Sequence, residues 1–462
     1  MLGLYPTWFE PGISSGWVVA FIATIHVLFS HASVGSAMLF AWLARRSVTH
    51  NRPEYITFIR RYGLFLLIFS YVLGSVTGPG IWFSATIANP RGLSALIHTF
   101  VWVWATEWVF FLIEVIGVYL LVYLAGRVNT RTYLRLTAIF ALASVATLLI
   151  IVGVLSFMLW PGTAQWAATG SVMHAFFGPN TLAQVFTRLF FMLMITGVVG
   201  GVIAGAIKDP TEKSVIGKAL AAVGSVGAVG GALCFMWYVR TLPETAMLII
   251  GTRLPVHFVD MMLAATVAAL VYFALTAFVP SVLKRSVAAV MTLVLLVFGI
   301  APEEMAREMI RKPWIAGQYV YGNQLIGRDI PALGVKSDLP LVAQKGVLAT
   351  HPFIPEALRR PNEQNMAEAG RVLALTLCSN CHALGKRGMR PITRFIPATA
   401  TVADVQSYLA AGLYRGHTAY MPAIPLPETD RRALATYLVQ AARSDNPGRL
   451  ALRGTQSSAM KE

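Results

Sequence analysis

Residues 104–115 read WATEWVFFLIEV and set two carboxylates into an otherwise apolar run. A helix that crosses a bilayer needs about 20 mostly apolar residues, and charged side chains inside such a helix are costly and usually functional. Glu107 and Glu114 are seven residues apart, which is two helical turns and therefore one face. The stretch predicts a transmembrane helix whose two acids form either a proton path or a hydrogen-bonded structural pair.

Similar apolar runs recur on both sides of this one. Hydrophobic residues make up 56% of the 462 residues and charged residues only 13%, whereas a soluble domain has about 25% charged residues. The eighth run is apolar only to Ala301, where the charged stretch PEEMAREMIRKPW follows. We expect an all-α fold, a polytopic membrane bundle of eight helices, with centres near residues 29, 73, 111, 146, 193, 228, 268 and 295.

The distribution of basic residues orients this bundle. The chain has 37 Lys and Arg against 21 Asp and Glu, a net charge of +16, and much of the excess falls in alternate loops. Cytoplasmic loops are the basic ones, so the N-terminus and the C-terminal tail should both be periplasmic in a bacterial inner membrane. No nucleic-acid partner and no removed signal peptide are expected. The basic loops contain Arg45, Arg46, Arg52, Arg60 and Arg61; Arg127, Arg131 and Arg135; Lys208, Lys213 and Lys218; and Lys284 and Arg285.

The composition changes after Trp314. Residues 315–365 are rich in Pro, Gly and scattered charge, as in a connector. Residues 366–446 form a compact tail, and residues 447–462 are expected to be disordered. The predicted organisation is therefore a transmembrane bundle over residues 1–314, a connector, a tail domain and a disordered end.

The tail contains the sequence LCSNCHAL at residues 377–384. Cys378, Cys381 and His382 form the C-x-x-C-H pattern, in which two thiols bond a haem and the histidine binds its iron. Met421, in AYMPAIP, is the expected second axial ligand, with His417 as the alternative. The segment resembles a class I cytochrome c with one covalent haem c. A zinc site would need a further Cys or His pair, which the tail lacks.

Other motifs lie in the bundle. His26 stands in the first apolar run, in IHVLFSH, and Glu304, Glu308 and Arg311 recur at helical spacing near the end of the eighth. In order along the chain, the segments SGWVVAFIATIHVLFSHASVG, YVLGSVTGPGIWFS, EWVFFLIEV, NTLAQV, VHFVDMML and EMIRKPWIAG resemble subunit I of the cytochrome bd oxygen reductases. The resemblance covers most of residues 15–320.

The resemblance implies roles for these residues. His26 would bind the oxygen-reducing haem, which is haem d or a b-type haem in its place. Glu308 would approach the iron of a neighbouring high-spin haem b, and Arg311 would neutralise haem propionates. Glu107 and Glu114 would conduct protons, although their spacing is one residue shorter than in the family.

The family also has a low-spin haem b, bound by a histidine of the fifth span and a methionine of the seventh. Met262 matches the methionine, but Thr187 or Leu189 falls where the histidine is expected. This haem is either lost or rebuilt with other ligands, so that one or two haem b groups are expected in all. The alternative ligands are His98, His174 and His257.

Two further departures concern electron entry. Only the segment from Thr241 to Pro255 separates the sixth and seventh spans, where quinol-oxidising members have a long loop, and the tail replaces a ninth span. We expect a respiratory oxidase that takes electrons from a cytochrome c or another periplasmic donor and reduces oxygen to water beside another membrane subunit or a second copy. Quinol oxidation with electrons leaving through the tail, nitric oxide reduction and a membrane-anchored cytochrome c remain alternatives.

Overall fold

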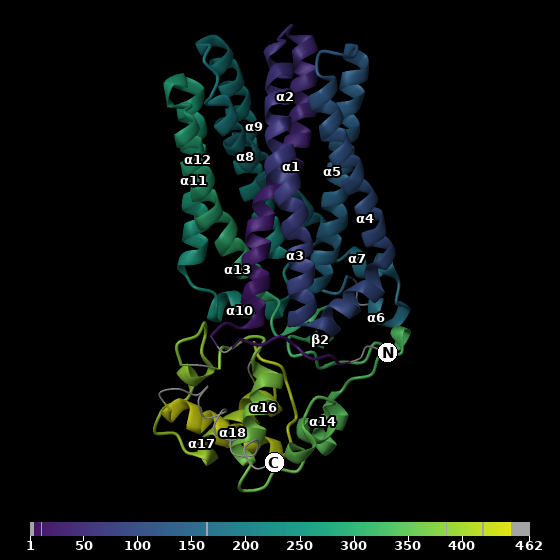
Figure 1. Cartoon of the computed structure of the whole chain (residues 1–462), viewed down its shortest axis with the longest axis vertical. Coiled ribbons are helices and arrows are strands. Elements are labelled where there is room, and N and C mark those ends of the chain that lie inside the picture. Colours follow the sequence, from purple (N-terminus) through teal and green to yellow (C-terminus); the bar gives the residue numbers. More distant parts are fainter. Residues whose placement is uncertain (1–3, 11, 163–164, 385, 418–419, 445–462) are drawn as a thin grey trace, which may run out of the picture.

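The computed structural model describes residues 4–10, 12–162, 165–384, 386–417 and 420–444, so the predicted disordered end at 447–462 lies outside the described residues. Within this part of the chain, eight helical segments are long and apolar enough to cross a membrane, which confirms the predicted bundle. They stand side by side, with the tail at one end (Figure 1). The spans are α1 (Ser15–Thr49); α2 (Glu54–Leu66) continued by η1 (Leu67–Val72) and α3 (Leu73–Ala88); α4 (Pro90–Leu124); α5 (Thr130–Leu159); α8 (Thr181–Ala204); α9 (Pro210–Arg240); α11 (His257–Phe278); and α12 (Arg285–Val294) continued by η3 (Leu295–Ile300) and α13 (Ala301–Ile310).

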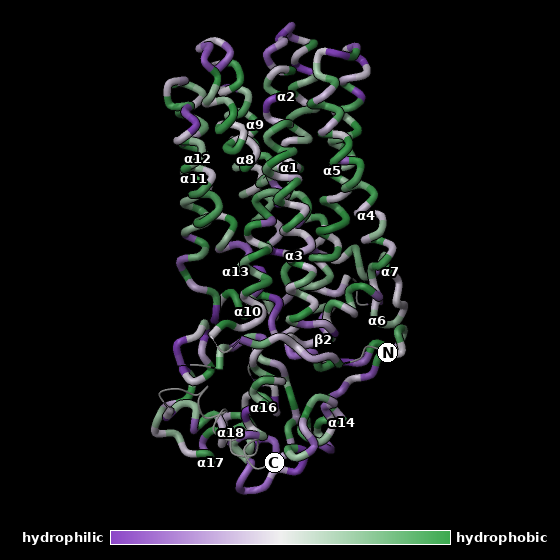
Figure 2. The backbone as a smooth tube through the Cα atoms, viewed as in Figure 1, coloured by the Kyte–Doolittle hydropathy of each residue, from purple (hydrophilic) through white to green (hydrophobic). Residues whose placement is uncertain are grey.

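Hydropathy follows this arrangement. Hydrophobic residues dominate the length of the spans, and hydrophilic ones gather at the end far from the tail and in the tail itself (Figure 2). Polar caps begin several spans. Asn89 accepts a hydrogen bond from the Gly92 amide at 2.7 Å, and Asp209 accepts one from the Glu212 amide at 2.7 Å. A proline follows each of these caps, at the first helical position, where its missing amide hydrogen costs nothing.

The centre of the bundle is close helix packing. α1 packs against α3, α5 and α8, and α8 packs along α9. At Gly197 of α8 an added Cβ would lie 3.0 Å from the Cα of Gly224 and 3.0 Å from the carbonyl oxygen of Leu220, both on α9. Small residues let helix backbones approach this closely in membranes. Phe40, Phe58 and their neighbours fill the rest of this core.

The final span stays helical through its charged end. The sequence becomes polar after Ala301, but the helix continues to Ile310 because the acids of α13 find basic partners on α8 and on α13 itself. Both this span and the second contain a π-helical turn, η3 and η1, and such turns in α-helices are often found at functional sites.

Short elements connect the spans and lead to the tail. A two-stranded hairpin follows α13, and the ring of Trp314 stacks on that of Tyr321 with centroids 4.3 Å apart. The connecting elements are α6 (Trp166–Thr169), α7 (Val172–Phe176), α10 (Glu244–Thr252), η2 (Pro280–Val282), β1 (Trp314–Ala316) and β2 (Val320–Tyr321). The later elements are η4 (Pro331–Leu333), α14 (Leu339–Lys345), α15 (Val347–Thr350), η5 (Glu356–Leu358), α16 (Met366–Cys378), η6 (Ile392–Phe395), α17 (Val402–Leu409), η7 (Ala410–Tyr414) and α18 (Glu428–Arg443).

The tail is built on α16 and α18 and rests on the bundle (Figure 1). Asn380 donates hydrogen bonds to the Ser15 hydroxyl at 3.1 Å and to the Ala88 carbonyl at 3.0 Å. Arg91, at the start of α4, pairs with Asp338 at 2.5 Å. The start of α1, the α3–α4 junction and the tail therefore meet at one end of the molecule.

Candidate functional site

His26 is held at one ring nitrogen by the second span. Its Nδ1 lies 2.9 Å from the hydroxyl of Thr77, and that hydroxyl is 2.9 Å from the Leu73 carbonyl. A hydroxyl has one hydrogen to donate; when it goes to Leu73, the His26 Nδ1–H donates to Thr77 and Nε2 keeps its lone pair. An added Cβ at Gly78 would lie 3.5 Å from the imidazole. In that tautomer, Thr77 and Gly78 orient the imidazole so that Nε2 is available as a metal ligand.

A buried ionic cluster lies between α8 and α13. Glu304 is 2% exposed and accepts from Arg188 at 3.4 Å and from Arg307, and Arg188 also reaches Glu303 at 3.4 Å. Both His26 and the buried His31 lie within electrostatic range of Glu304. The structure therefore brings the first span and the last one together around paired charges.

Glu308 stands one turn beyond Glu304 and has two basic partners. Its carboxylate pairs with the Arg311 guanidinium and, at 2.8 Å, with the Lys312 ammonium. The Nε of Arg311 is buried and has no hydrogen-bond partner among the described residues. A buried donor without a partner is costly, so a carboxylate of a bound group, such as a haem propionate, fits beside Arg311.

Glu114 and Glu107 differ in their surroundings. Glu114 is buried at 3% exposure with the Tyr71 hydroxyl 3.5 Å from its Oε2, and its Oε1 has no partner within the described chain. Glu107, two turns earlier on α4, is half-buried. The two acids share one face of α4, as their spacing predicts. Glu107 lies at a half-buried position, and Glu114 is buried inside the bundle.

In the tail motif, the His382 ring is held by one hydrogen bond. The Nδ1–H of the buried His382 donates to the Arg390 carbonyl at 3.2 Å, which leaves Nε2 for a metal. Burial, with nearby Arg390, lowers the pKa of His382 to about 4, so the imidazole is neutral at pH 7. Cys378 ends α16, and Cys381 follows one turn later. Met421 packs against the tail core, whereas His417 is exposed.

Arg390 also contacts Tyr420, the residue before Met421. Its guanidinium hydrogen-bonds the Tyr420 hydroxyl and lies 4.1 Å from the centre of the Tyr420 ring. Tyr420 in turn packs with Ile310 at the end of α13. Among the described residues, no three His, Cys, Asp or Glu side chains form a group that could hold a metal ion.

The tail motif lies against the charged end of the last span. Lys312, which pairs with Glu308, is within electrostatic range of Cys381. An added Cβ at Gly322, in the turn after β2, would lie 3.7 Å from the Cys381 sulfur. Glu308, of the predicted bundle residues, is therefore a neighbour of the tail motif through Lys312.

The residues do not fit the low-spin haem of the resemblance. The Thr187 hydroxyl donates to the Ala183 carbonyl at 2.8 Å, and the next residue, Arg188, belongs to the ionic cluster. Met262 is only partly buried. None of the alternative ligands is buried: His98 and His257 are exposed, and His174 bonds the Thr169 hydroxyl at 2.8 Å.

Sequence reasoning missed several of these residues. Arg188 had a signal, because it is a charge inside the apolar fifth span, and such residues are functional by default. Thr77 lies in the quoted segment YVLGSVTGPGIWFS, where no role was assigned to it. Arg390 and Asn380 gave no local signal, since their partners are distant in the chain. Lys312 lies only four residues from Glu308, in the quoted segment EMIRKPWIAG, but had no role assigned to it.

These observations define the class: a multi-pass helical membrane protein with the fold of a bd-type oxidase. The solved structure of the bd oxidase from Geobacillus thermodenitrificans is similar to it with a TM-score of 0.53 and 16% sequence identity, over 71% of this chain and 92% of that chain. At this identity the likeness concerns the fold. No protein-family model and no curated protein matches the sequence.

Proposed function

We propose that the protein is the catalytic subunit of a terminal oxidase that oxidises a cytochrome c through a haem c in its tail and reduces oxygen to water in its bundle. The observation that carries the proposal is the contact between the two sites. The C-x-x-C-H segment touches α1 and the α3–α4 junction through Asn380, and Lys312 joins Glu308 to the neighbourhood of Cys381.

In the tail, Cys378 and Cys381 would hold the haem covalently, with His382 and Met421 as axial ligands. The arrangement supports this, because Arg390 fixes the His382 tautomer and packs on Tyr420 beside Met421. A thioether ligand raises the reduction potential of haem iron. The tail therefore suits electron acceptance from a periplasmic donor.

In the bundle, His26 would hold the haem at which oxygen is reduced, haem d or haem b. Glu308 would serve the iron of a neighbouring haem b, and Arg311 its propionates. When bound, haem supplies the electron transfer and oxygen chemistry, and the protein supplies ligation and protons. Glu107 and Glu114 would each hold a proton on its way to the site, because both carboxylates lie on one face of α4.

The proposal also covers the orientation of the protein in the membrane and its partner subunits. The basic loops favour an inner membrane with the N-terminus and tail on the periplasmic side. A second membrane subunit or a second copy would complete the complex, as in the family that the sequence resembles. The low-spin haem is absent from this proposal because Thr187 or Leu189 stands where its histidine ligand is expected.

The test combines a haem count with oxygen uptake. Pyridine haemochrome spectra of the full-length protein should give one haem c and two non-covalent haems per chain, and reduced cytochrome c should drive oxygen uptake. His26→Ala should remove a high-spin haem signal and the uptake while the haem c remains. His50→Ala, at the exposed end of the same helix, is the control and should change neither.

Other outcomes would reject the proposal. A protein with haem c alone would be a membrane-anchored electron carrier. Quinol-dependent reduction of added cytochrome c without oxygen uptake would mean that electrons flow the other way. A His26→Ala variant with an unchanged haem spectrum would remove this histidine from the site.

A further inference from the structure

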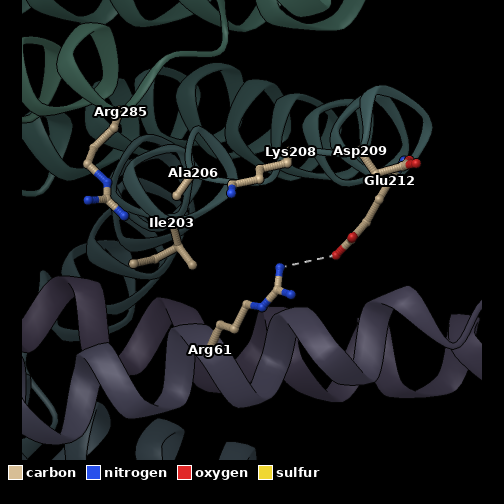
Figure 3. Close-up of a pocket in the computed structure, with 7 residues that line it drawn as sticks. All are labelled: Arg61, Ile203, Ala206, Lys208, Asp209, Glu212 and Arg285. Carbon is tan, nitrogen blue, oxygen red and sulfur yellow. Dashed lines mark hydrogen bonds and ion pairs between the residues drawn. The ribbon is translucent and has the colours of Figure 1, made fainter.

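The end of the bundle far from the tail contains a pocket of about 490 Å³ (Figure 3). We call it the Arg61 pocket. Arg61 of α2, Lys208 of the α8–α9 turn and Arg285 at the start of α12 reach into it from three elements, as the close-up shows. It takes no part in the proposed oxidase chemistry.

Two of the three basic side chains in the pocket have no acidic partner among the described residues. Neither Lys208 nor Arg285 forms an ion pair within the described ranges. Arg61 pairs with Glu212 at 3.4 Å, but half of the Arg61 side chain is exposed, and such surface pairs are worth about 0–1 kcal/mol. A phosphate, which accepts several charge-assisted hydrogen bonds at once, can outcompete that pair.

The backbone holds the pocket in shape. An added Cβ at Gly205 would collide with the backbone of Lys284 and Arg285, so the end of α8 and the start of α12 are in direct contact. Asp209 is engaged as the cap of α9, through its 2.7 Å bond to the Glu212 amide. The backbone segments that carry Lys208 and Arg285 are therefore already in place for a bound phosphate.

A second observation indicates the source of the phosphate. A groove of about 400 Å³ with an almost entirely apolar lining runs between α11 and α12. On α12 its lining includes Ser286 and Val287, which follow Arg285 directly in the sequence. The pocket itself has an apolar side formed by Ile203 and Ala206. A charged pocket next to an apolar groove, at the end of membrane spans, matches a lipid headgroup with its acyl chain.

We propose that the Arg61 pocket binds the phosphate group of an anionic phospholipid, with an acyl chain in the groove between α11 and α12. Arg61, Lys208 and Arg285 bind the phosphate oxygens. Glu212 opposes the ligand, since it competes for Arg61. Removal of the Glu212 charge should therefore strengthen phosphate binding, whereas removal of any of the three cations should weaken it.

The test measures binding to the full-length protein, purified in detergent and depleted of lipid. Native mass spectrometry and thermal unfolding follow the addition of phosphatidylglycerol, of zwitterionic phosphatidylcholine, or of inorganic phosphate. Arg285→Ala should weaken phosphatidylglycerol binding about tenfold, which corresponds to about 1.4 kcal/mol, and Glu212→Gln should strengthen it. Arg60→Ala and Lys284→Ala remove neighbouring charges that do not line the pocket and should change binding less than twofold.

Each outcome has one meaning. Equal losses in Arg285→Ala and Lys284→Ala would overturn the site, because binding would then follow total charge. Stabilisation by inorganic phosphate as large as that by phosphatidylglycerol would overturn the lipid assignment. Equal binding of phosphatidylcholine and phosphatidylglycerol would overturn the selectivity for anionic lipid. Unfolding temperatures measured without lipid show whether each variant folds. If Arg285→Ala is unstable, Glu212→Gln still tests the site: unchanged or weaker phosphatidylglycerol binding in that variant would overturn it.

Discussion

Two histidines in different parts of the molecule share one arrangement. His26 in the bundle and His382 in the tail each have Nδ1 bonded to a fixed oxygen, of Thr77 and of Arg390, and neither Nε2 has a hydrogen-bond partner in the described residues. A histidine that binds a metal usually donates its other ring nitrogen in this way. The likeness supports both ligand proposals through geometry rather than through motif.

The methionine of the tail gives a sharp prediction. Met421→Ala should lower the reduction potential of the haem c, because the soft thioether is lost, while the haem stays attached through Cys378 and Cys381. A potentiometric titration of the haem c band measures this. His417→Ala is the matched control and should leave the potential unchanged; a fall in His417→Ala instead would exchange the two ligands.

A buried histidine makes stability depend on pH. Burial and the nearby Arg91 lower the pKa of His351, in the connector between the bundle and the tail. Its folded pKa lies below the unfolded value of about 6.5, so its stabilising contribution is present above pH 6.5 and is lost as the pH falls below it. Unfolding temperatures between pH 7.5 and 5 should fall less in His351→Gln than in the parent. Equal slopes would contradict this assignment.

Among the elements, the interface of α8 and α9 depends on a missing side chain. Gly197→Ala should destabilise the bundle by about 1–3 kcal/mol, the usual cost of overpacking, because backbone atoms of Leu220 and Gly224 lie 3.0 Å from the new Cβ. Thermal unfolding in detergent measures it. Gly251→Ala in α10, where a Cβ would meet nothing within 4 Å, is the control. Equal unfolding temperatures in the two variants would show that the helices can separate freely.

The elements also show what the sequence can predict. Span positions follow from local hydropathy, and the eight spans are confirmed. The helical spacing of Glu304, Glu308 and Arg311 agrees with the helix that continues from Ala301 to Ile310, but the pairing of Glu304 with Arg188, 116 residues away, could not be predicted from that spacing. The grouping of His26 with Thr77 and of His382 with Arg390 likewise requires packing, whereas C-x-x-C-H is a local pattern.

On the scale of the whole molecule, the two ends of the bundle differ. The Arg61 pocket and the basic loops lie at one end and the tail at the other (Figure 1). Lys336→Cys, on an exposed residue of the connector that leads to the tail, should react with a membrane-impermeant thiol reagent in intact spheroplasts. Arg131→Cys, on an exposed residue at the start of α5, should react only after lysis. The reverse pattern would invert the proposed orientation.

The position of Asn380 has a consequence for biogenesis. It lies between the two cysteines and bonds Ser15 and Ala88, so the attachment segment faces the bundle once the tail has docked. An enzyme that joins haem to these thiols needs that segment open. Maturation should therefore have a fixed order in time, with haem attachment first and docking second. A pulse-chase experiment should find the haem on newly made chains before their tails resist protease, and the opposite order would contradict it.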